Sequence, residues 1–390
     1  MRSRRPRDCG IPVNARLSPE PHDVAALRRR LQAELKARYA EFLQGARRVV
    51  LVDFPNVPNV GDSAIWLGQK AMLAELGVEV LSQTERRTYS AARLRRFPRE
   101  VPILIHGGGN MGDIWPAHER LRLSVVRDFP RRRIVQLPQS VHYSSERARD
   151  ESARVLRAHG NFTPLARDRN SLAILAGPMG LDAALCPDSA LAIDIARRRE
   201  PVVNVLCLKR TDRESDSAER IEGPDVEVVD WLEDAPWWGL TLIRQLERIR
   251  VNYPRRLAFI GDAISLAYNS LASRRLERGL GLLSRGRVVV TDRLHAHLLC
   301  LLCGIPHVLV DNNYGKLSAF HEAWTAASPL TWWADDFRHA VALARELAQS
   351  PVGLRSSLAE TGTLPVHARA EPARAAKSRP LAGGSLNGKS

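Results

Sequence analysis

Short runs of apolar and β-branched residues alternate along the chain with stretches in which apolar residues recur at helical spacing. The short runs have the length of buried strands, and most are followed by loops rich in Gly, Pro, Asn or Asp. Strands are predicted at residues 49–54, 78–81, 101–105, 133–137, 164–166, 202–208, 226–229, 257–260, 288–290 and 308–310. Helices are predicted at residues 22–44, 63–76, 172–175, 240–251 and 318–349, the last with a break at Trp332 and Trp333. A further helix is predicted after Asp292, and it contains the apolar run 298–302. This alternation favours an α/β fold with parallel sheets.

Residues 287–306 combine a strand, a tight turn and an apolar helix that ends at a Gly and a Pro. The start of this helix carries Arg293, His295 and His297. Free backbone N–H groups and the positive end of the helix dipole lie at the same place. A guanidinium and imidazoles there predict an anion-binding site with a built-in proton donor. The alternative is a core helix whose first turn merely faces solvent.

Other predicted strands end in glycine-rich or polar loops. In a parallel sheet such loops lie at the carboxyl ends of the strands and line the crevice where ligands bind, so they supply further candidates. Two of these candidates, Arg167 and Arg169, are two residues apart and need not share a target; one can form a structural salt bridge while the other binds a ligand. A run of three glycines can also be a simple turn at a sheet edge. The candidates are Asp62, Gly107, Gly108, Gly109, Asn110, Arg167 and Arg169.

The composition limits the class of protein. A length of 390 residues suggests two to three domains, and 44% hydrophobic with 26% charged residues suits a globular protein with a full core. No apolar run approaches the ~18 residues of a transmembrane helix, and the arginine-rich start lacks the apolar segment of a secretory signal. Five cysteines fit a reducing compartment, so a cytoplasmic protein is expected.

The formal net charge of +15 favours phosphorylated partners, such as nucleic acid, anionic lipid headgroups or diphosphate-bearing substrates. The arginines are spread through the chain without an aromatic-interleaved basic patch or zinc-finger spacing, so nucleic acid is not expected as a partner. Cys300 and Cys303 form a CxxC pair inside an apolar helix and are interpreted as core residues. No metal site is predicted.

Changes in composition divide the chain into four predicted segments. A polar stretch, IARRREP, separates two α/β units, and both ends of the chain are basic and poor in apolar residues. The predicted segments are a disordered basic arm at 1–19, an N-terminal Rossmann-like domain with a leading helix at 20–197, a C-terminal Rossmann-like domain with the anion site at 198–350, and a disordered tail at 351–390.

Six motifs in a fixed order resemble the polysaccharide pyruvyl transferase family over about residues 48–325. They are NVGDSAI, HGGGNMGD, QLPQS, ARDRNS, CPDSAL and TDRLHAHLLCLLCGIP. The resemblance implies a fold similar to GT-B glycosyltransferases, in which two Rossmann-like domains face each other across a cleft. It also implies transfer of a pyruvyl group from phosphoenolpyruvate to a sugar, as a ketal on a surface polysaccharide or its lipid-linked precursor.

The resemblance assigns roles to particular residues. Its Arg-Leu-His triplet binds the donor, with the His as the acid, and corresponds to Arg293, Leu294 and His295. One arginine of the ARDRNS motif also corresponds to a donor-binding residue, and Arg167 is favoured over Arg169.

Further correspondences concern the loops of the N-terminal cleft and the last strand. Asp62 matches one of these loops, and the chemistry of ketal formation makes it a candidate base for the sugar hydroxyl. Helix geometry, and not the resemblance, makes His297 the rival acid, because it shares a helix face with Arg293. The remaining family positions are Gly107, Gly108, Gly109 and Lys316. No cofactor or metal is required, because arginines can neutralise the donor.

Two other functions stay open on the sequence alone. One is a GT-B glycosyltransferase that uses a nucleotide sugar, because the fold does not determine the donor. The other is a non-catalytic protein that binds anions or nucleic acid. The basic ends are a candidate peripheral contact with the anionic inner leaflet of the membrane, where a lipid-linked acceptor would be found.

Overall fold

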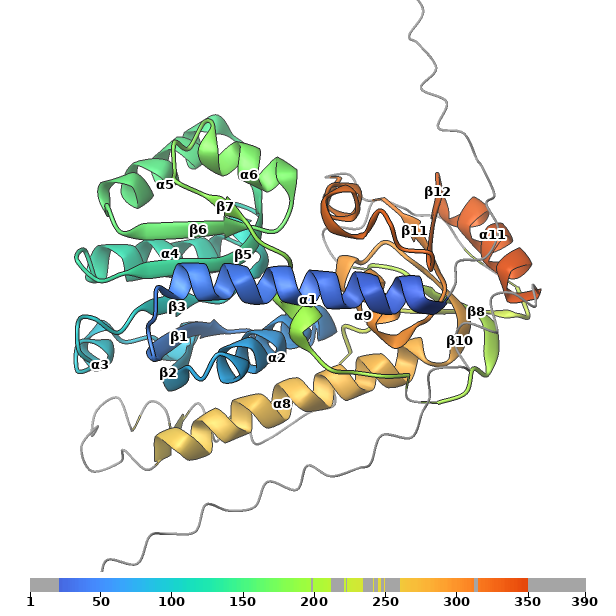
Figure 1. Cartoon of the computed structure of the whole chain (residues 1–390), viewed down its shortest axis with the longest axis horizontal. Coiled ribbons are helices and arrows are strands. Elements are labelled where there is room, and N and C mark those ends of the chain that lie inside the picture. The colour runs from blue at the N-terminus through green and yellow to red at the C-terminus, as the bar shows by residue number, and fades with distance from the viewer. Residues whose placement is uncertain are drawn as a thin grey trace, which may run out of the picture.

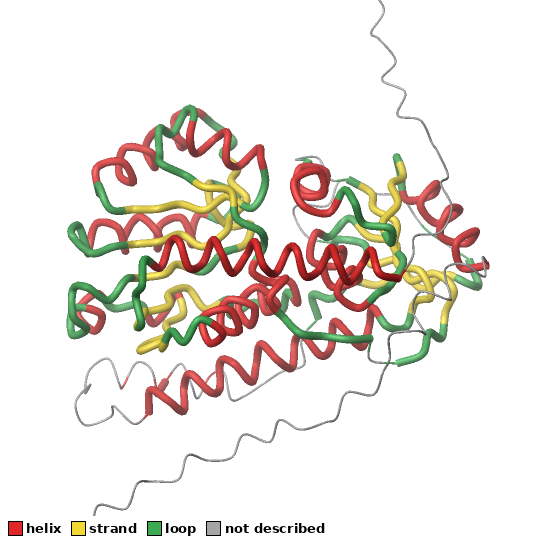
Figure 2. The backbone as a smooth tube through the Cα atoms, in the orientation of Figure 1, coloured by secondary structure: helices red, strands yellow, loops and turns green. Residues whose placement is uncertain are grey.

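The computed structural model describes residues 21–197, 199–211, 221, 223–233, 241, 245, 246, 249, 260–311 and 315–349. Within these residues the chain forms two parallel β-sheets with helices packed around them (Figures 1 and 2). The predicted α/β class with parallel sheets is confirmed. The predicted arm and tail lie outside the described residues, as do most of the predicted helix 240–251 and almost all of the predicted strand 257–260.

The first sheet has the strand order β2-β1-β3-β5-β6-β7, and β4 pairs with β5. Its pairs are parallel. The core that a side chain enters alternates along the interior strand β1, since Val49 and Leu51 enter one apolar core while Val50 and Val52 enter another. The strands are β1 (Arg48–Phe54), β2 (Glu79–Glu85), β3 (Ile103–Ile105), β4 (Gly108–Gly112), β5 (Ile134–His142), β6 (Phe162–Ala166) and β7 (Ala184–Leu185).

The second sheet has the strand order β12-β11-β10-β8-β9, again with parallel pairs. The central strand β10 reads GRVVVT, and its β-branched residues are buried between helices. The strands are β8 (Val203–Leu208), β9 (Val226–Val229), β10 (Gly286–Thr291), β11 (His307–Val310) and β12 (Thr331–Ala334). The two sheets lie on opposite sides of the predicted boundary near residue 197, and the domain limits themselves stay predictions.

The helices cover both sheets, and two of them, α1 and α8, are long and extend from the first sheet toward the second (Figure 1). The α-helices are α1 (Pro21–Leu43), α2 (Val60–Glu75), α3 (Ala91–Leu94), α4 (Pro116–Asp128), α5 (Glu146–Ala158), α6 (Arg169–Ala176), α8 (Ile260–Leu283), α9 (Leu294–Cys303), α10 (Lys316–Phe320) and α11 (Phe337–Gln349). Shorter turns are η1 (Arg86–Thr88), η2 (Ser189–Ala192) and the π-helical η3 (His321–Thr325). None of the described helices is both long and apolar enough to cross a membrane.

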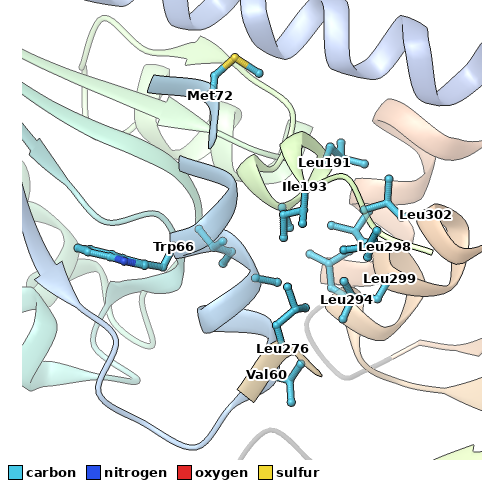
Figure 3. Close-up of a cluster of buried hydrophobic side chains, with 14 of the residues drawn as sticks. Val60, Trp66, Met72, Leu191, Ile193, Leu276, Leu294, Leu298, Leu299 and Leu302 are labelled. Carbon is cyan, nitrogen blue, oxygen red and sulfur yellow. The ribbon is translucent and has the colours of Figure 1, made fainter. Parts of the chain in front are cut away.

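One apolar core joins the two sheets. It contains Leu51 of the first sheet and Val289 of the second, together with side chains of α1, α2, α8 and α9. Figure 3 shows part of it, with Leu298 of α9 close to Leu191 and Ile193. This shared core is called the central core below. The outer face of each sheet has a separate core, against α4 and α5 for the first sheet and against α11 for the second.

Helix α8 connects the two sheets directly, because it packs on α2 and contacts both β2 and β10. The ring of Tyr268 stacks on Phe54 at 4.3 Å between centroids, and Trp66 Nε1 donates to Asn269 Oδ1 at 3.0 Å. Residues that are more than 200 positions apart in the chain are therefore in direct contact. These contacts lie next to the loop that follows β1, and they join the first sheet to helix α8.

Two predicted segments differ from the structure. The glycine-rich stretch after β3 was expected as a turn, but Gly108–Gly112 forms the short strand β4. The expected helical break at Trp332 and Trp333 is strand β12, which closes the edge of the second sheet. In both cases the pairing with a neighbouring strand overrides local preference, because glycine is a poor strand former and the flanking sequence is helical.

Candidate active site

A cavity of about 340 Å³ opens where the carboxyl ends of the strands of both sheets converge. Its lining comes from β4 and from the loops and helix starts that follow β1, β4, β6, β8, β9, β10 and β11. Among the described lining residues, four carry a permanent positive charge and one is a carboxylate. The ionisable lining residues are Asp62, His118, Arg167, Arg210, Arg293, His295 and Lys316. The cavity is therefore built for an anion.

Arg167 follows β6 and is almost completely buried. Its Nε donates to Ser140 Oγ at 2.9 Å, and its Nη1 donates to Asp188 Oδ2 at 2.8 Å. Asp188 also caps η2 by accepting from the backbone N–H of Ala190. Directly behind it, the Ser189 hydroxyl lies 2.8 Å from the hydroxyl of Tyr39 on α1. The guanidinium of Arg167 is thus positioned by the Asp188 carboxylate, and the backbone of η2 fixes the position of that carboxylate.

His295 lies in the first turn of α9 and brings a titratable ring to the same place. Its Nε2 is 3.5 Å from Asp188 Oδ2 and 3.4 Å from Arg167 Nη1. Burial alone would raise the pKa of Asp188, but the hydrogen bond and charge of His295 and the charge of Arg167 hold that pKa well below its usual value. Asp188 is therefore a carboxylate that can stabilise a protonated His295.

The start of α2 shapes the space for this ring. A Cβ built on Gly61 would overlap the imidazole of His295, so the ring packs directly on the backbone of Gly61. The N-cap of α2 is Asn59, whose Oδ1 accepts from the N–H of Gly61 and whose Nδ2 donates to Asp62 Oδ2 at 3.0 Å. The predicted base Asp62 lines the cavity while it also takes part in this cap.

The other predicted donor-binding cations, Arg293 and Lys316, both follow strands of the second sheet, and Gly109 of β4 lies beside one of them. Arg293 is the N-cap of α9, and its Nη2 is 2.7 Å from Asp230. A Cβ built on Gly109 would lie 3.2 Å from Arg167 Nη2 and 4.0 Å from Lys316 Nζ. The missing side chain at Gly109 thus leaves open the space beside two cationic groups, which a small anion can use.

A second histidine, His118 of α4, lies on the cavity wall supplied by the first sheet. Its Nδ1 is 2.7 Å from Oδ2 of Asp53, which is almost fully buried in β1. Aspartate inside an otherwise apolar strand is unusual, and its backbone φ of 74° lies in the left-handed region. Strained, buried polar residues of this kind occur mainly at functional sites.

The structure brings together most of the predicted site residues. Leu294, Gly109 and Asn110 line the cavity with the charged residues above. Gly107 and Gly108 are outside its lining, as is Arg169, which is exposed at the start of α6. Arg167, the favoured arginine of its motif, is the one that lines the cavity.

His297 also lies outside the cavity lining and is fully buried on the inner side of α9. Ile305 O can only accept, so His307 Nδ1 donates to it at 2.8 Å, and His307 Nε2 therefore accepts from His297 Nδ1 at 2.7 Å. His297 Nε2 then accepts from Thr325 Oγ1 at 2.8 Å, and Thr325 accepts from His321 Nδ1 at 3.0 Å. This placement gives no support to a role for His297 as rival acid.

These side chains are called the histidine network below: His297, His307, His321 and Thr325. Burial lowers the pKa of His307 and of His321 to about 4, and burial with the charges of the other two rings lowers that of His297 well below its usual value. The network is therefore neutral near neutral pH and ties α9 to β11 and η3.

Several site residues were not identified from the sequence. Asp188 belongs to the CPDSAL motif but had no assigned role, and the signal for Asp53 was a charged residue within the apolar run VVLVDF. Nothing in the local sequence marks His118, Asp230 or Arg210, because only the tertiary fold brings them to the cavity. No group of three or more His, Cys, Asp or Glu side chains suited to a metal ion occurs in the described part of the chain.

Comparisons with known proteins agree with the motifs. Residues 59–314 match the model of the polysaccharide pyruvyl transferase family. The chain is 32% identical to pyruvyl transferase 1 of Schizosaccharomyces pombe, over 73% of this chain and 72% of that protein. It is 25% identical to the Bacillus subtilis protein EpsO, whose name assigns it provisionally to the pyruvyl transferases, over 80% of this chain and 94% of that protein.

A likeness to a solved structure concerns the fold alone. The crystal structure of a functionally uncharacterised Klebsiella pneumoniae protein superimposes with a TM-score of 0.54 at 15% sequence identity. The match covers 78% of this chain and 99% of that one.

Proposed function

The chain belongs to the polysaccharide pyruvyl transferase family, a family of transferases, and we propose that its donor substrate is phosphoenolpyruvate. The acceptor in this proposal is a sugar of a surface polysaccharide or of its lipid-linked precursor, and the product is a pyruvate ketal. The two sheets would then correspond to the two Rossmann-like domains of a GT-B-like enzyme. The protein would act in the cytoplasm, at or near the inner leaflet of the membrane.

The observation that carries the proposal is the concentration of cationic side chains around one titratable imidazole. Phosphoenolpyruvate carries a carboxylate and a phosphate, and a phosphate monoester has a charge of about −1.5 to −2 at neutral pH. Arg167, Arg293 and Lys316 approach the cavity from three different elements. Guanidinium groups bind carboxylate and phosphate through paired hydrogen bonds, and the start of α9 adds backbone N–H groups.

His295 is the proposed acid. Protonation of C3 of phosphoenolpyruvate converts its C=C bond into a methyl group and leaves C2 electrophilic. A sugar hydroxyl then attacks C2, the C2–O bond to phosphate breaks, and a second hydroxyl closes the ketal. One of the two hydroxyl protons replaces the proton given by His295, and the other leaves with phosphate. Asp188, 3.5 Å from His295 Nε2, stabilises the imidazolium before the transfer.

No cofactor takes part in this scheme, because the donor already contains the leaving group and the arginines balance its charge. The proposal therefore includes turnover without a metal ion. The carrying test is phosphate release from phosphoenolpyruvate in the presence of a panel of p-nitrophenyl hexosides, with a nucleotide sugar as the rival donor. Release from phosphoenolpyruvate that persists in EDTA is the expected result. Turnover of the nucleotide sugar alone, or loss of activity in EDTA that a divalent ion restores, contradicts the scheme.

Donor binding is tested separately by Arg293→Lys. An ammonium cannot reproduce the paired hydrogen bonds of a guanidinium, so the KM for phosphoenolpyruvate should rise with a smaller change in kcat. The matched control is Arg147→Lys, at a side chain that is 90% exposed and outside the cavity lining. Equal KM values for both variants would remove Arg293 from the donor site.

A further inference from the structure

The Asp53–His118 pair is built by an irregularity in the first sheet. The pairing of β1 with β2 shifts register between Val52 and Phe54, and Asp53 at this point has a φ of 74°. A bulge of this kind re-aims a side chain and occurs often beside active sites. Here it sends a carboxylate out of an apolar strand to meet a helix that begins at the cavity wall.

The hydrogen bond with Asp53 determines which ring nitrogen of His118 carries the proton. A carboxylate accepts hydrogen bonds, so His118 Nδ1 carries the proton and donates to Asp53 Oδ2 at 2.7 Å. Nε2 is then the nitrogen with a lone pair, and no hydrogen bond from Nε2 to a described residue is seen. The second oxygen, Asp53 Oδ1, is buried and has no hydrogen-bond partner among the described residues.

This arrangement is suited to accepting a proton. When Nε2 of His118 takes one up, the imidazolium is stabilised by the adjacent carboxylate, as in other carboxylate–histidine pairs that act as general bases. The imidazolium in turn compensates the charge of the buried carboxylate, whose Oδ1 has no hydrogen-bond partner among the described residues. His118 lines the same cavity as His295, but it comes from α4 and has its own carboxylate.

We propose that His118, oriented by Asp53, is the general base that deprotonates the acceptor hydroxyl. The inference rests on the proposed function, which needs one group to give a proton to C3 and another to take a proton from oxygen. As the O–C2 bond forms, the hydroxyl proton moves to His118 Nε2, and it then leaves with the departing phosphate. No water, oxidant or reductant is consumed. His118 is the catalytic residue in this step and Asp53 is a positioning residue.

Asp62 is the rival base, since it also lines the cavity. Its Oδ2 accepts from Asn59 Nδ2 within the cap of α2, so part of its hydrogen-bonding capacity serves the local structure. No hydrogen bond with a described residue occupies His118 Nε2. The two candidates lie on different elements and can be removed one at a time.

The test compares His118→Ala, Asp53→Asn and Asp62→Asn with the wild type, using phosphoenolpyruvate and p-nitrophenyl hexosides. Removal of a general base should lower kcat by roughly 10²–10⁴-fold. Added imidazole should restore part of the activity of His118→Ala, because it can fill the vacated space and accept the proton. Asn tolerates a positive φ, so Asp53→Asn removes the charge without a backbone change and should lower kcat with little change in donor KM.

Controls separate catalysis from folding and from donor binding. His339→Ala, at an exposed ring outside the cavity lining, should keep wild-type activity and ignore imidazole. Phosphoenolpyruvate should raise the melting temperature of wild type and His118→Ala equally, because the donor cations are intact. If His118→Ala does not fold, His118→Gln replaces it, since Gln can still donate to Asp53 but cannot take up the proton.

The outcomes distinguish the two levels of the argument. Activity of His118→Ala within about threefold of wild type, or activity lost without any response to imidazole, overturns the inference while the proposed function stands. A large loss in Asp62→Asn combined with an active His118→Ala assigns the base to Asp62. A wild-type protein that releases no phosphate from phosphoenolpyruvate overturns the proposed function and this inference together.

Discussion

His295 occupies a position where one ring meets a cation and a carboxylate at similar distances. Arg167 Nη1 and Asp188 Oδ2 are 3.4 and 3.5 Å from its Nε2. Arg167 is one of the cations proposed to bind the donor, and Asp188 contacts both Arg167 and His295. The same carboxylate therefore positions the donor-binding cation and the proposed acid.

The role of His295 leads to a prediction for single residues. His295→Asn should lower kcat by roughly 10²–10⁴-fold with a smaller change in donor KM, because Asn keeps a polar side chain but cannot carry the proton. Steady-state kinetics with phosphoenolpyruvate checks this. His297→Asn is the informative companion: it should lower the melting temperature and leave kcat per folded molecule near wild type. A larger kcat loss in His297→Asn than in His295→Asn would move the acid to His297.

The sequence predicted that Arg293 and His295 share a site but could not show where His297 points, and the reason is helix geometry. Residues two apart on a helix point about 200° from each other, so Arg293 and His295 can share a target only at the very start of a helix. The structure has that geometry, since Arg293 is the N-cap of α9. Helical spacing alone could not tell that His297 faces inward, because α9 is apolar on both sides.

At the scale of elements, the contact between α2 and α9 places the acid. Gly61→Ala puts a methyl group where the His295 ring now lies, so the ring must move. A displacement of about 1 Å can cost roughly 100-fold in rate, and kcat of Gly61→Ala should fall by that order. In the His295→Asn background the same change should cost much less, since the acid is already absent.

The control for this prediction is Gly281→Ala in α8. Among the described residues, its added Cβ would meet only the flexible end of Arg199, at 3.0 Å. Kinetic parameters of Gly281→Ala should stay at wild-type values. Equal and fully additive losses from Gly61→Ala in both backgrounds would show that Gly61 acts on the fold rather than on His295.

The histidine network makes a prediction about acid stability. Its rings stay neutral in the native state down to a pKa of about 4 for His307 and His321, whereas unfolded histidine protonates near pH 6.5. The unfolded state therefore binds more protons between these values, and the free energy of unfolding should fall on acidification by about 1.4 kcal/mol per pH unit for each such ring. Urea unfolding between about pH 7.5 and pH 5 measures this slope.

The variant His321→Gln isolates one ring, because Gln can still donate to Thr325 but does not titrate. Its slope should be smaller than that of wild type by about one proton. Burial raises the pKa of Asp292 to about 6, which acts in the opposite sense over part of this range but is common to both proteins. Identical slopes would show that His321 titrates alike in the folded and unfolded chain.

The elements themselves were largely predictable where burial dominates. The apolar and β-branched composition of residues 49–54 and 202–208 predicts buried strands, and the structure has β1 and β8 there. Strand β4 was missed because three glycines provide no side-chain pattern, and its pairing with β5 depends on residues distant in the chain. The pattern also could not show that Asp53 sits on a bulge, since register is a property of two strands.

At the scale of the whole molecule, the two sheets pack on the same apolar core, the central core. Sequence periodicity marks which side chains are buried but not which partner buries them, so this shared core was not predicted. Large apolar interfaces restrict relative motion of the units they join. The cavity therefore has fixed walls on both sides, and its cations are organised before a donor binds.

The shared core predicts a single unfolding transition. Leu156→Ala in the outer core of the first sheet and Val341→Ala in that of the second should each lower the midpoint of the same calorimetric peak. The ratio of calorimetric to van't Hoff enthalpy should stay near one in both. Two separated peaks, each moved by only one of the variants, would show that the sheets unfold independently.

The supports of the site extend beyond the segment that identifies the family. The match begins at residue 59, whereas Asp53 holds His118 and Tyr39 of α1 reaches the residue next to Asp188. Recombination between two family members at the edges of the matched segment would join a foreign α1 and β1 to an otherwise complete set of motifs. Such a chimera would keep every residue of the family motifs, but the residues that position His118 and Asp188 would come from a different protein. The segment that activity requires is therefore longer than the segment that identifies the family.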